Sequence, residues 1–145
     1  MPVRSSEATW RGGVHDGDGE LELGSGAWQG RYTFRSRFEA DEPKKSNPEE
    51  LLAAGHAGCY SLALANRLEG AGHEPDRVHT TADCHIEMDD EKGPTITRID
   101  LETEATVEGI DDERFREMAH AAKVGCPVSR AVNAPEITLE AERVA

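Results

Sequence analysis

The sequence predicts an α+β fold in a single domain over residues 1–145, and three observations support this prediction. Several short runs alternate polar and apolar residues between glycine clusters, which is typical of strands. One long stretch, at 48–71, carries the start and stop signals of a helix. The order is strands, helix, two strands, helix and strand, in a chain long enough to bury one core.

The first strands are expected between residues 7 and 39. The segments "EATWRGG", "GELELG" and "QGRYTFRSRFEA" alternate, and "HDGDG" and "GSG" separate them as turns. This pattern predicts an antiparallel β-meander, followed by a polar loop at "DEPKKSNP".

The long helix over 48–71 has clear boundaries. Asn47 can act as its N-cap, Pro48 suits its first position, and Glu50 can close a capping box with Asn47. The segment "GAGHEPD" ends it with glycine and proline.

The second half of the chain predicts a hairpin, a helix and a last strand. "RVHTTADCHIEMDD" and "TITRIDLETEATVEG" alternate on either side of a turn at Gly93 and Pro94. "DDERFREMAHAAKVG" is a helix capped by Asp111 or Asp112 and ended by Gly125. "CPVSRAVN" can form a short third helix, and "PEITLEAERV" is the last strand. We expect antiparallel sheets around two main helices.

The charge of the chain excludes some function classes. It holds 29 acidic and 16 basic residues, a net charge of −13, which repels nucleic acid and anionic membrane surfaces. The start of the sequence has no apolar signal region, and no apolar run is long enough to span a membrane. We therefore expect a cytoplasmic protein that binds neither nucleic acid nor membranes.

Three cysteines without a secretory signal argue against a disulfide framework, so each is either buried and inert or reactive. Cys59 lies in "AAGHAGCYSLAL", where two glycines each cost about 1 kcal/mol relative to alanine. Close helix packing would offset that cost, but it does not explain a cysteine there. Cys126, between Gly125 and Pro127, is either a helix N-cap that favours a thiolate or a small residue in a tight corner. The sequence alone does not show that the two cysteines meet.

The segments "SNPEELLAAGHAGCYSLALA", "TTADCHIE", "ITRIDLETEATVEGID" and "AKVGCPVSRAVNAPEITLE" resemble the OsmC/Ohr family of thiol peroxidases. The resemblance runs from about Trp10 to the C-terminus, and "YTFRSRFEA" is similar to the OsmC branch. It implies an OsmC-like fold and an intertwined homodimer with its active sites at the interface.

The resemblance also implies roles for particular residues. Cys59 corresponds to the peroxidatic cysteine and Cys126 to the resolving cysteine. Arg37 corresponds to the arginine near the thiolate, with Arg35 as an alternative two residues away, and Glu49 to the glutamate that pairs with this arginine.

The implied activity is reduction of organic hydroperoxides, and more weakly of hydrogen peroxide, in oxidative or osmotic stress defence. Cys59 would become a sulfenic acid and then a disulfide with Cys126. A lipoyl or thioredoxin-like dithiol would reduce this disulfide, with no metal or organic cofactor. The alternatives are a redox-sensing or ligand-binding protein with little turnover and a structural protein with inert cysteines.

The spacing of Glu49 and Cys59 constrains this site. On one straight helix they are about 15 Å apart along the axis and about 80° apart around it. Either the helix breaks near Gly55, or Glu49 of one subunit serves Cys59 of the other.

The remaining candidates each have an ordinary structural interpretation. His56 is three residues before Cys59 and is either a base or thiolate partner or a histidine packed at the interface. Ser129 can be a capping hydroxyl, and Cys84 matches no functional position. No C-x-x-C or H-x-x-x-H pair exists, so we expect no metal site. The candidates for a substrate pocket, or for the core, are Phe34, Phe38, Tyr60, Phe115 and Met118.

Overall fold

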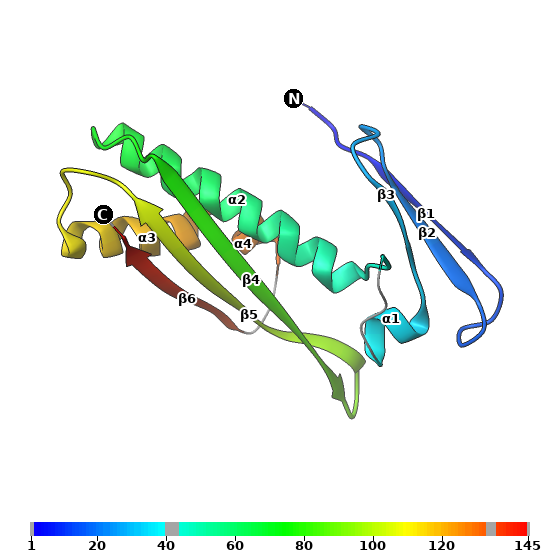
Figure 1. Cartoon of the computed structure of the whole chain (residues 1–145). Coiled ribbons are helices and arrows are strands. Elements are labelled where there is room, and N and C mark those ends of the chain that lie inside the picture. Colours follow the sequence, from blue (N-terminus) through cyan, green and yellow to red (C-terminus); the bar gives the residue numbers. More distant parts are fainter. Residues whose placement is uncertain (1, 40–43, 133–135, 145) are drawn as a thin grey trace. The chain divides into compact units, whose positions relative to one another are not determined.

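The computed structural model describes residues 2–39, 44–132 and 136–144, which form two compact units, Met1–Leu51 and Leu52–Ala145 (Figure 1). Each unit has its own three-stranded sheet. The predicted loop at 41–48 and the predicted start of the last strand at Pro135 lie wholly or partly outside the described residues. The single domain over 1–145 stays a prediction.

The sheet of the first unit is the predicted antiparallel meander. Its strands β1 (Ser6–Arg11), β2 (Asp18–Leu23) and β3 (Gln29–Tyr32) pair in chain order. Gly19 pairs with both Trp10 and Tyr32, whose rings lie 5.5 Å apart. A Cβ at Gly19 would stand 2.3 Å from the Tyr32 ring, so this position requires glycine.

The prediction that the third strand continues into "TFRSRFEA" is wrong. The strand ends at Tyr32, and a short helix, α1 (Phe34–Phe38), follows it. A capping box explains the change: Ser36 N–H donates to Thr33 Oγ1, and Thr33 N–H donates to Ser36 Oγ. This local bonding outweighs the alternation of polar and apolar side chains.

Helix α2 (Pro48–Gly70) begins and ends within one residue of its prediction. The backbone N–H of Glu50 donates to Asn47 Oδ1 at 2.7 Å, which confirms Asn47 as its cap, and the Glu50 carboxylate accepts from Ser46 Oγ. The helix runs without interruption through Gly55, so the break considered there is wrong.

The second sheet contains β4 (Arg77–Asp89), β5 (Gly93–Thr106) and β6 (Glu136–Arg143), in that order. The predicted β4–β5 hairpin is confirmed, but its turn lies at 90–92, where Asp89 accepts from two backbone N–H groups. Gly93 and Pro94 instead begin β5.

The expectation of wholly antiparallel sheets is wrong for β6, which pairs parallel to β5. Parallel neighbours require a long crossover, and the chain between these strands supplies two helices. They are α3 (Asp112–Gly125), capped by Asp111, and α4 (Pro127–Ala131), which confirms both sequence predictions.

The core of the second unit lies between α2, α3 and the sheet (Figure 1). Helix α2 contributes Tyr60, Leu64 and Leu68 to this core, and β5 contributes Ile99 and Leu101. The predicted apolar stripe of α3 is buried there, as are the end of β5 and the corner before α4: Phe115, Met118, Ala119, Ala122, Ala105, Val107, Ile110 and Cys126.

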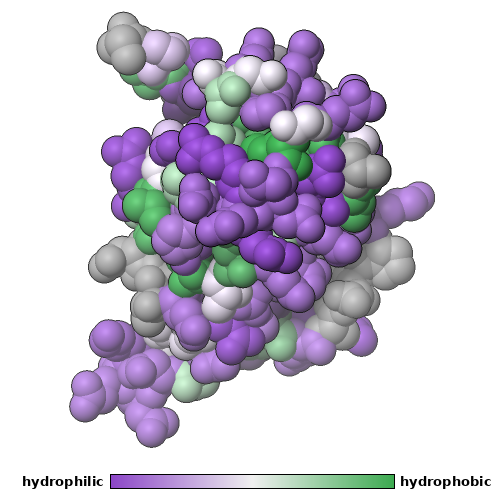
Figure 2. All heavy atoms as spheres, turned by 90° about the vertical axis from the view of Figure 1, so that its left-hand side faces the viewer, coloured by the Kyte–Doolittle hydropathy of each residue, from purple (hydrophilic) through white to green (hydrophobic). Residues whose placement is uncertain are grey.

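The face shown in Figure 2 is mostly hydrophilic, with small hydrophobic areas between hydrophilic residues. This surface agrees with the acidic composition. Among the described residues, no helix has the length and apolar character needed to cross a bilayer.

Candidate active site

Two cysteines meet inside the second unit. Cys59 lies in the middle of α2, and Cys126 occupies the corner where α3 ends and α4 begins. Both are free thiols, and they lie close enough for each to shift the pKa of the other. Cys126 is fully buried, whereas Cys59 is partly exposed. The structure thus joins two residues that are 67 positions apart in the sequence.

The surroundings of the two sulfurs favour a single negative charge. Burial raises the pKa of Cys59, and its hydrogen bond to Cys126 raises it further. Burial also opposes the Cys126 thiolate, but the Ser129 N–H, the Cys59 thiol and the Ser129 hydroxyl outweigh burial, so the pKa of Cys126 is lowered. The ionisation of each thiol therefore depends on the other.

His56 and Ser129 extend this cluster. His56 Nε2 lies 2.8 Å from Ser129 Oγ, and Ser129 is among the groups that lower the pKa of Cys126. The His56 side chain is fully buried, and burial lowers its pKa, so the ring is neutral at physiological pH. Sequence spacing had related His56 to Cys59, but in the structure it contacts Ser129, which the sequence suggested only as a cap.

Arg37 and Glu49 form an ion pair in the first unit. Arg37 Nη2 donates to Glu49 Oε1 at 2.8 Å, and Arg37 Nε donates to Oε1 and Oε2 at 3.0 and 3.2 Å. Glu49 is buried in the first turn of α2, while the arginine side chain remains about one-third exposed. The pairing fixes the guanidinium, and among the described residues no hydrogen bond from its Nη1 is present.

An aromatic cavity of about 310 Å³ lies beside Arg37. Phe34 and Phe38, which the sequence suggested, line it together with Trp10 and Tyr32, which sequence reasoning missed. The missed residues lie on β1 and β3, and only their pairing with Gly19 on β2 brings their rings together. The other suggested pocket residues, Tyr60, Phe115 and Met118, pack in the core of the second unit.

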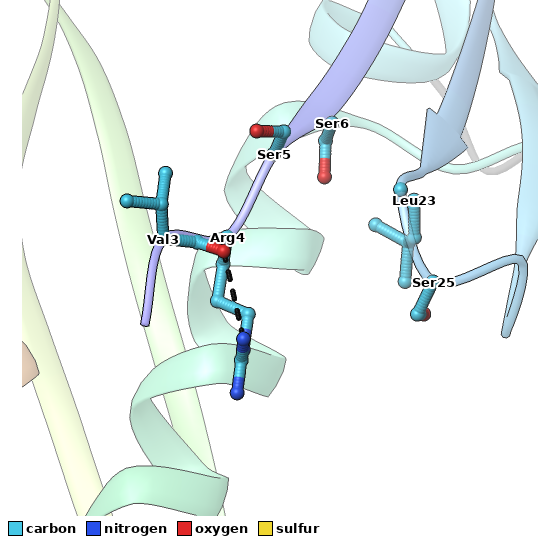
Figure 3. A pocket seen from close by; sticks show the side chains of 7 residues that line it. Val3, Arg4, Ser5, Ser6, Leu23 and Ser25 are labelled. Atoms are coloured by element: carbon cyan, nitrogen blue, oxygen red, sulfur yellow. Dashed lines mark hydrogen bonds between the residues drawn. The ribbon is translucent and has the colours of Figure 1, made fainter. Parts of the chain in front are cut away.

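A second cavity, of about 640 Å³, gives access to Cys59. Leu62, Ala63 and Arg67 of α2 line it, together with Pro127 of α4. A further hollow, between the start of the chain and the end of β2, holds Arg4 bonded to the Val3 carbonyl and contains no thiol (Figure 3).

Cys84 lies on β4 opposite Ile99 and packs against the core. This position agrees with a packing role. Within the described parts of the chain, no three His, Cys, Asp or Glu side chains gather closely enough to hold a metal ion.

The features above define an α+β protein in which a cysteine of a long helix meets a second cysteine at the corner between α3 and α4, and comparison with known proteins gives its family. The model of the OsmC-like protein family matches residues 41–142. Peroxiredoxin OsmC of Escherichia coli (strain K12) is 42% identical over 138 residues, which cover 94% of both chains. The chain belongs to the OsmC family.

Other relatives are more distant. An organic hydroperoxide resistance protein-like sequence of Mycoplasma pneumoniae is 29% identical over 94 residues, 64% of each chain. Among solved structures, an OsmC-like protein of Vibrio cholerae matches with a TM-score of 0.77 at 15% identity, over 97% of this chain and 99% of that one. The organic hydroperoxide resistance protein OhrB of Bacillus subtilis gives 0.72 at 24% identity, over 97% and 98%. These matches confirm the OsmC-like fold.

Proposed function

We propose that this protein reduces organic hydroperoxides through Cys59 and Cys126, in the defence of the cytoplasm against oxidative or osmotic stress. As an OsmC-family member with 42% identity to a peroxiredoxin over nearly its whole length, the chain is a peroxidase. The observation that supports the two-cysteine mechanism is the proximity of Cys59 and Cys126, which shift each other's pKa, because disulfide formation requires them to meet.

The first step oxidises Cys59. Its proton passes to Cys126 along their hydrogen bond, and the Cys59 thiolate attacks the outer oxygen of the hydroperoxide. The O–O bond breaks, leaving a Cys59 sulfenic acid and an alkoxide. The alkoxide takes the proton from Cys126, giving the alcohol and leaving Cys126 as a thiolate.

The second step joins the two sulfurs. The Cys126 thiolate attacks the sulfenic sulfur, the S–S bond forms, and hydroxide leaves and is protonated to water. A dithiol reductant, lipoyl or thioredoxin-like, then restores both thiols by exchange.

The accessibility of the two thiols supports Cys59 as the residue that reacts first. Cys59 is partly exposed beside an open cavity, whereas Cys126 is fully buried behind it. A peroxide therefore reaches Cys59 first, although the charge of the resting pair is better stabilised at Cys126.

Arg37 and Glu49 are proposed to serve the thiol of the partner subunit in a homodimer. The continuous helix separates Glu49 from Cys59 of the same chain by about 15 Å along its axis. On α2, Ala54, Gly55 and Gly58 are exposed and small, which supports a close crossing with a second copy of this helix. The guanidinium, held by Glu49, would stabilise the alkoxide as it forms.

The aromatic cavity beside Arg37 supports an organic substrate. Trp10, Tyr32, Phe34 and Phe38 provide an apolar surface for an alkyl or aryl group next to the cation. Hydrogen peroxide lacks such a group and would gain nothing from this surface, so it should be the poorer substrate.

The test is steady-state reduction of cumene hydroperoxide and hydrogen peroxide, with a lipoyl dithiol or a thioredoxin system as reductant. We expect turnover with at least one reductant, a higher kcat/KM for cumene hydroperoxide, and loss of turnover in Cys59→Ser. Cys84→Ser is the matched control and should stay active. Disulfide formation without turnover would instead favour a redox sensor.

A further inference from the structure

The cavity beside Cys59 holds a positively charged side chain that the steps above do not use. Arg67, in the last turn of α2, lines this cavity of about 640 Å³ together with Asn66. Among the described residues, neither side chain has a hydrogen bond or an ion pair. Arginines elsewhere, such as Arg37 and Arg114, pair with a carboxylate. Arg67 therefore places an unpaired cation in the cavity that leads to the thiol.

The sequence of α2 explains why Arg67 has no carboxylate partner on its own helix. Side chains that meet on a helix surface are three or four residues apart. The residues at these distances from Arg67 are Ala63, Leu64, Gly70 and Ala71, and none of them is charged. In a chain with 29 acidic residues, this arrangement leaves the guanidinium available to a ligand.

The end of α3 shows where the guanidinium lies. Gly125 is the last residue of α3, and a Cβ on it would stand 2.7 Å from Arg67 Nη2. The guanidinium therefore rests against the backbone just before Cys126, where the negative end of the α3 dipole favours a cation. The cation thus lies at the cavity wall that Gly125 and Pro127 form.

The thiol and the cation lie at the two ends of an apolar surface. Asn66 and Arg67 follow Cys59 on one continuous helix, about 10–12 Å further along its axis. Leu62 and Ala63 lie between them on α2 and also line the cavity. A ligand that reaches both ends needs an apolar chain of several bonds with an anionic group at its end.

We propose that Arg67 and Asn66 form a carboxylate-binding subsite of the Cys59 cavity. The guanidinium fork matches the two oxygens of a carboxylate, and the Asn66 amide supplies a further donor. The carboxylate belongs either to a hydroperoxide or to a small dithiol reductant, since both must enter by this cavity. The proposal rests on the proposed function in one respect, namely that Cys59 is the thiol that these molecules reach.

The charge of the whole chain makes a preference for anions informative. With a net charge of −13, the protein repels a carboxylate over most of its surface. A carboxylate that binds better than a neutral molecule of the same length must therefore meet a local cation. Among the described residues that line the cavity, Arg67 and Cys59 are the titratable ones, so substitution of Arg67 removes the positive charge of the lining.

The first test needs no peroxide. Octanoate and octanamide, which have the same length and differ in charge, compete with iodoacetamide for access to Cys59 in a Cys84→Ser background. Peptide mass analysis measures the alkylation of Cys59. Octanoate should protect at about tenfold lower concentration than octanamide, because it forms hydrogen bonds between charged groups. Arg67→Gln should weaken protection by octanoate about tenfold and leave octanamide unchanged, and Arg67→Lys, which loses the fork, should be intermediate.

Arg77→Gln is the matched control, because Arg77 begins β4 outside the cavity lining and its substitution removes the same charge. It should leave protection by octanoate unchanged. Equal protection by octanoate and octanamide in the parent, or a loss of less than about twofold in Arg67→Gln, would overturn the proposal. If Arg67→Gln does not fold, Arg67→Met decides by the same criterion. A variant that weakens the dimer but keeps the protection would assign Arg67 to a subunit contact and would also overturn the proposal.

The second test identifies the molecule that carries the carboxylate. One arm compares ω-hydroperoxyoctanoate with its methyl ester as oxidants, and the other compares dihydrolipoate with dihydrolipoamide as reductants. In one arm, Arg67→Gln should lower kcat/KM for the acid about tenfold and leave its neutral counterpart nearly unchanged, and that arm gives the source. No selective loss in either arm would overturn the proposal. If Cys59 does not react with the hydroperoxides, the proposed function fails, but protection by octanoate still tests the subsite.

Discussion

The neighbouring thiols of Cys59 and Cys126 are the central feature at the scale of residues. The pKa of Cys126 is lowered by Ser129 and by the Cys59 thiol, and the same hydrogen bond raises the pKa of Cys59. In the proposed mechanism the partly exposed Cys59 meets the peroxide, while the surroundings favour negative charge on the buried Cys126. Motifs alone identified both cysteines, but their proximity depends on the corner at Gly125 and Pro127.

Substitution of the arginines distinguishes Arg37 from Arg35. Arg37 donates through two nitrogens to Glu49, a geometry that lysine cannot reproduce. We expect Arg37→Lys to lower kcat/KM for cumene hydroperoxide by about a hundredfold, as for loss of a donor to a developing oxyanion. The control Arg35→Lys should stay within about twofold of the parent, and the reverse pattern would contradict the assignment.

Burial of His56 predicts a pH dependence of stability. Its pKa is lowered by burial from an ordinary value of 6.5, so below about pH 6.5 the unfolded chain binds a proton that the folded chain does not. Stability from this group is present above pH 6.5 and is lost as pH falls toward the folded-state pKa, by at most about 1.4 kcal/mol per pH unit.

Urea unfolding at pH 7.5 and pH 5.5 measures this effect. His56→Gln should lose less stability between the two pH values than the parent does. His120→Gln, on the exposed face of α3, is the control and should behave like the parent. An equal loss in the parent and in His56→Gln would contradict the prediction.

At the scale of elements, local hydrogen bonds decided where sequence patterns failed. The alternation in "YTFRSRFEA" favoured a strand, but the Thr33 and Ser36 side chains cap a helix there. The alternation correctly predicted the last strand, β6. Alternation does not show whether a strand pairs parallel or antiparallel with its neighbour. That depends on the crossover through α3 and α4, which is a property of the whole second unit.

The glycines of α2 allow a test of the proposed helix crossing. A Cβ at Gly58 meets nothing within 4 Å in the described chain, so alanine there should stabilise an isolated helix by about 1 kcal/mol. A second helix crossing at this point would leave no room for the added methyl group. We therefore expect Gly58→Ala to destabilise the protein and to weaken its dimer, as measured by thermal unfolding and sedimentation.

Gly70→Ala is the control for that substitution, because Gly70 ends the same helix and also has open space. It should leave the dimer intact. A stabilised Gly58→Ala with unchanged association would contradict a close helix crossing.

At the scale of the whole molecule, the account requires two chains. Leu62 on α2 is 73% exposed beside the Cys59 cavity, and the nearby small residues are exposed as well. Exposed apolar surface of this kind marks an interaction site. We expect sedimentation to give twice the 15.8 kDa mass of one chain. Leu62→Glu should lower the measured mass toward that of a single chain. A monomer that retains full peroxidase activity would contradict the shared site.

The sequence predicted the family, the α+β class and most element boundaries, because caps such as Asn47 and Asp111 and the alternation in β4 and β5 are local signals. It did not predict the Ser129 contacts or the roles of Trp10 and Tyr32 in the aromatic cavity. Those contacts join segments far apart in the chain, and no local pattern records them.

The most direct test of the central claim is a count of free thiols with peptide mass analysis after one equivalent of cumene hydroperoxide. The chain has three cysteines. The account predicts that one free thiol, Cys84, remains and that the peptides of Cys59 and Cys126 are linked. Three unchanged thiols, or a link that includes Cys84, would contradict the two-cysteine mechanism.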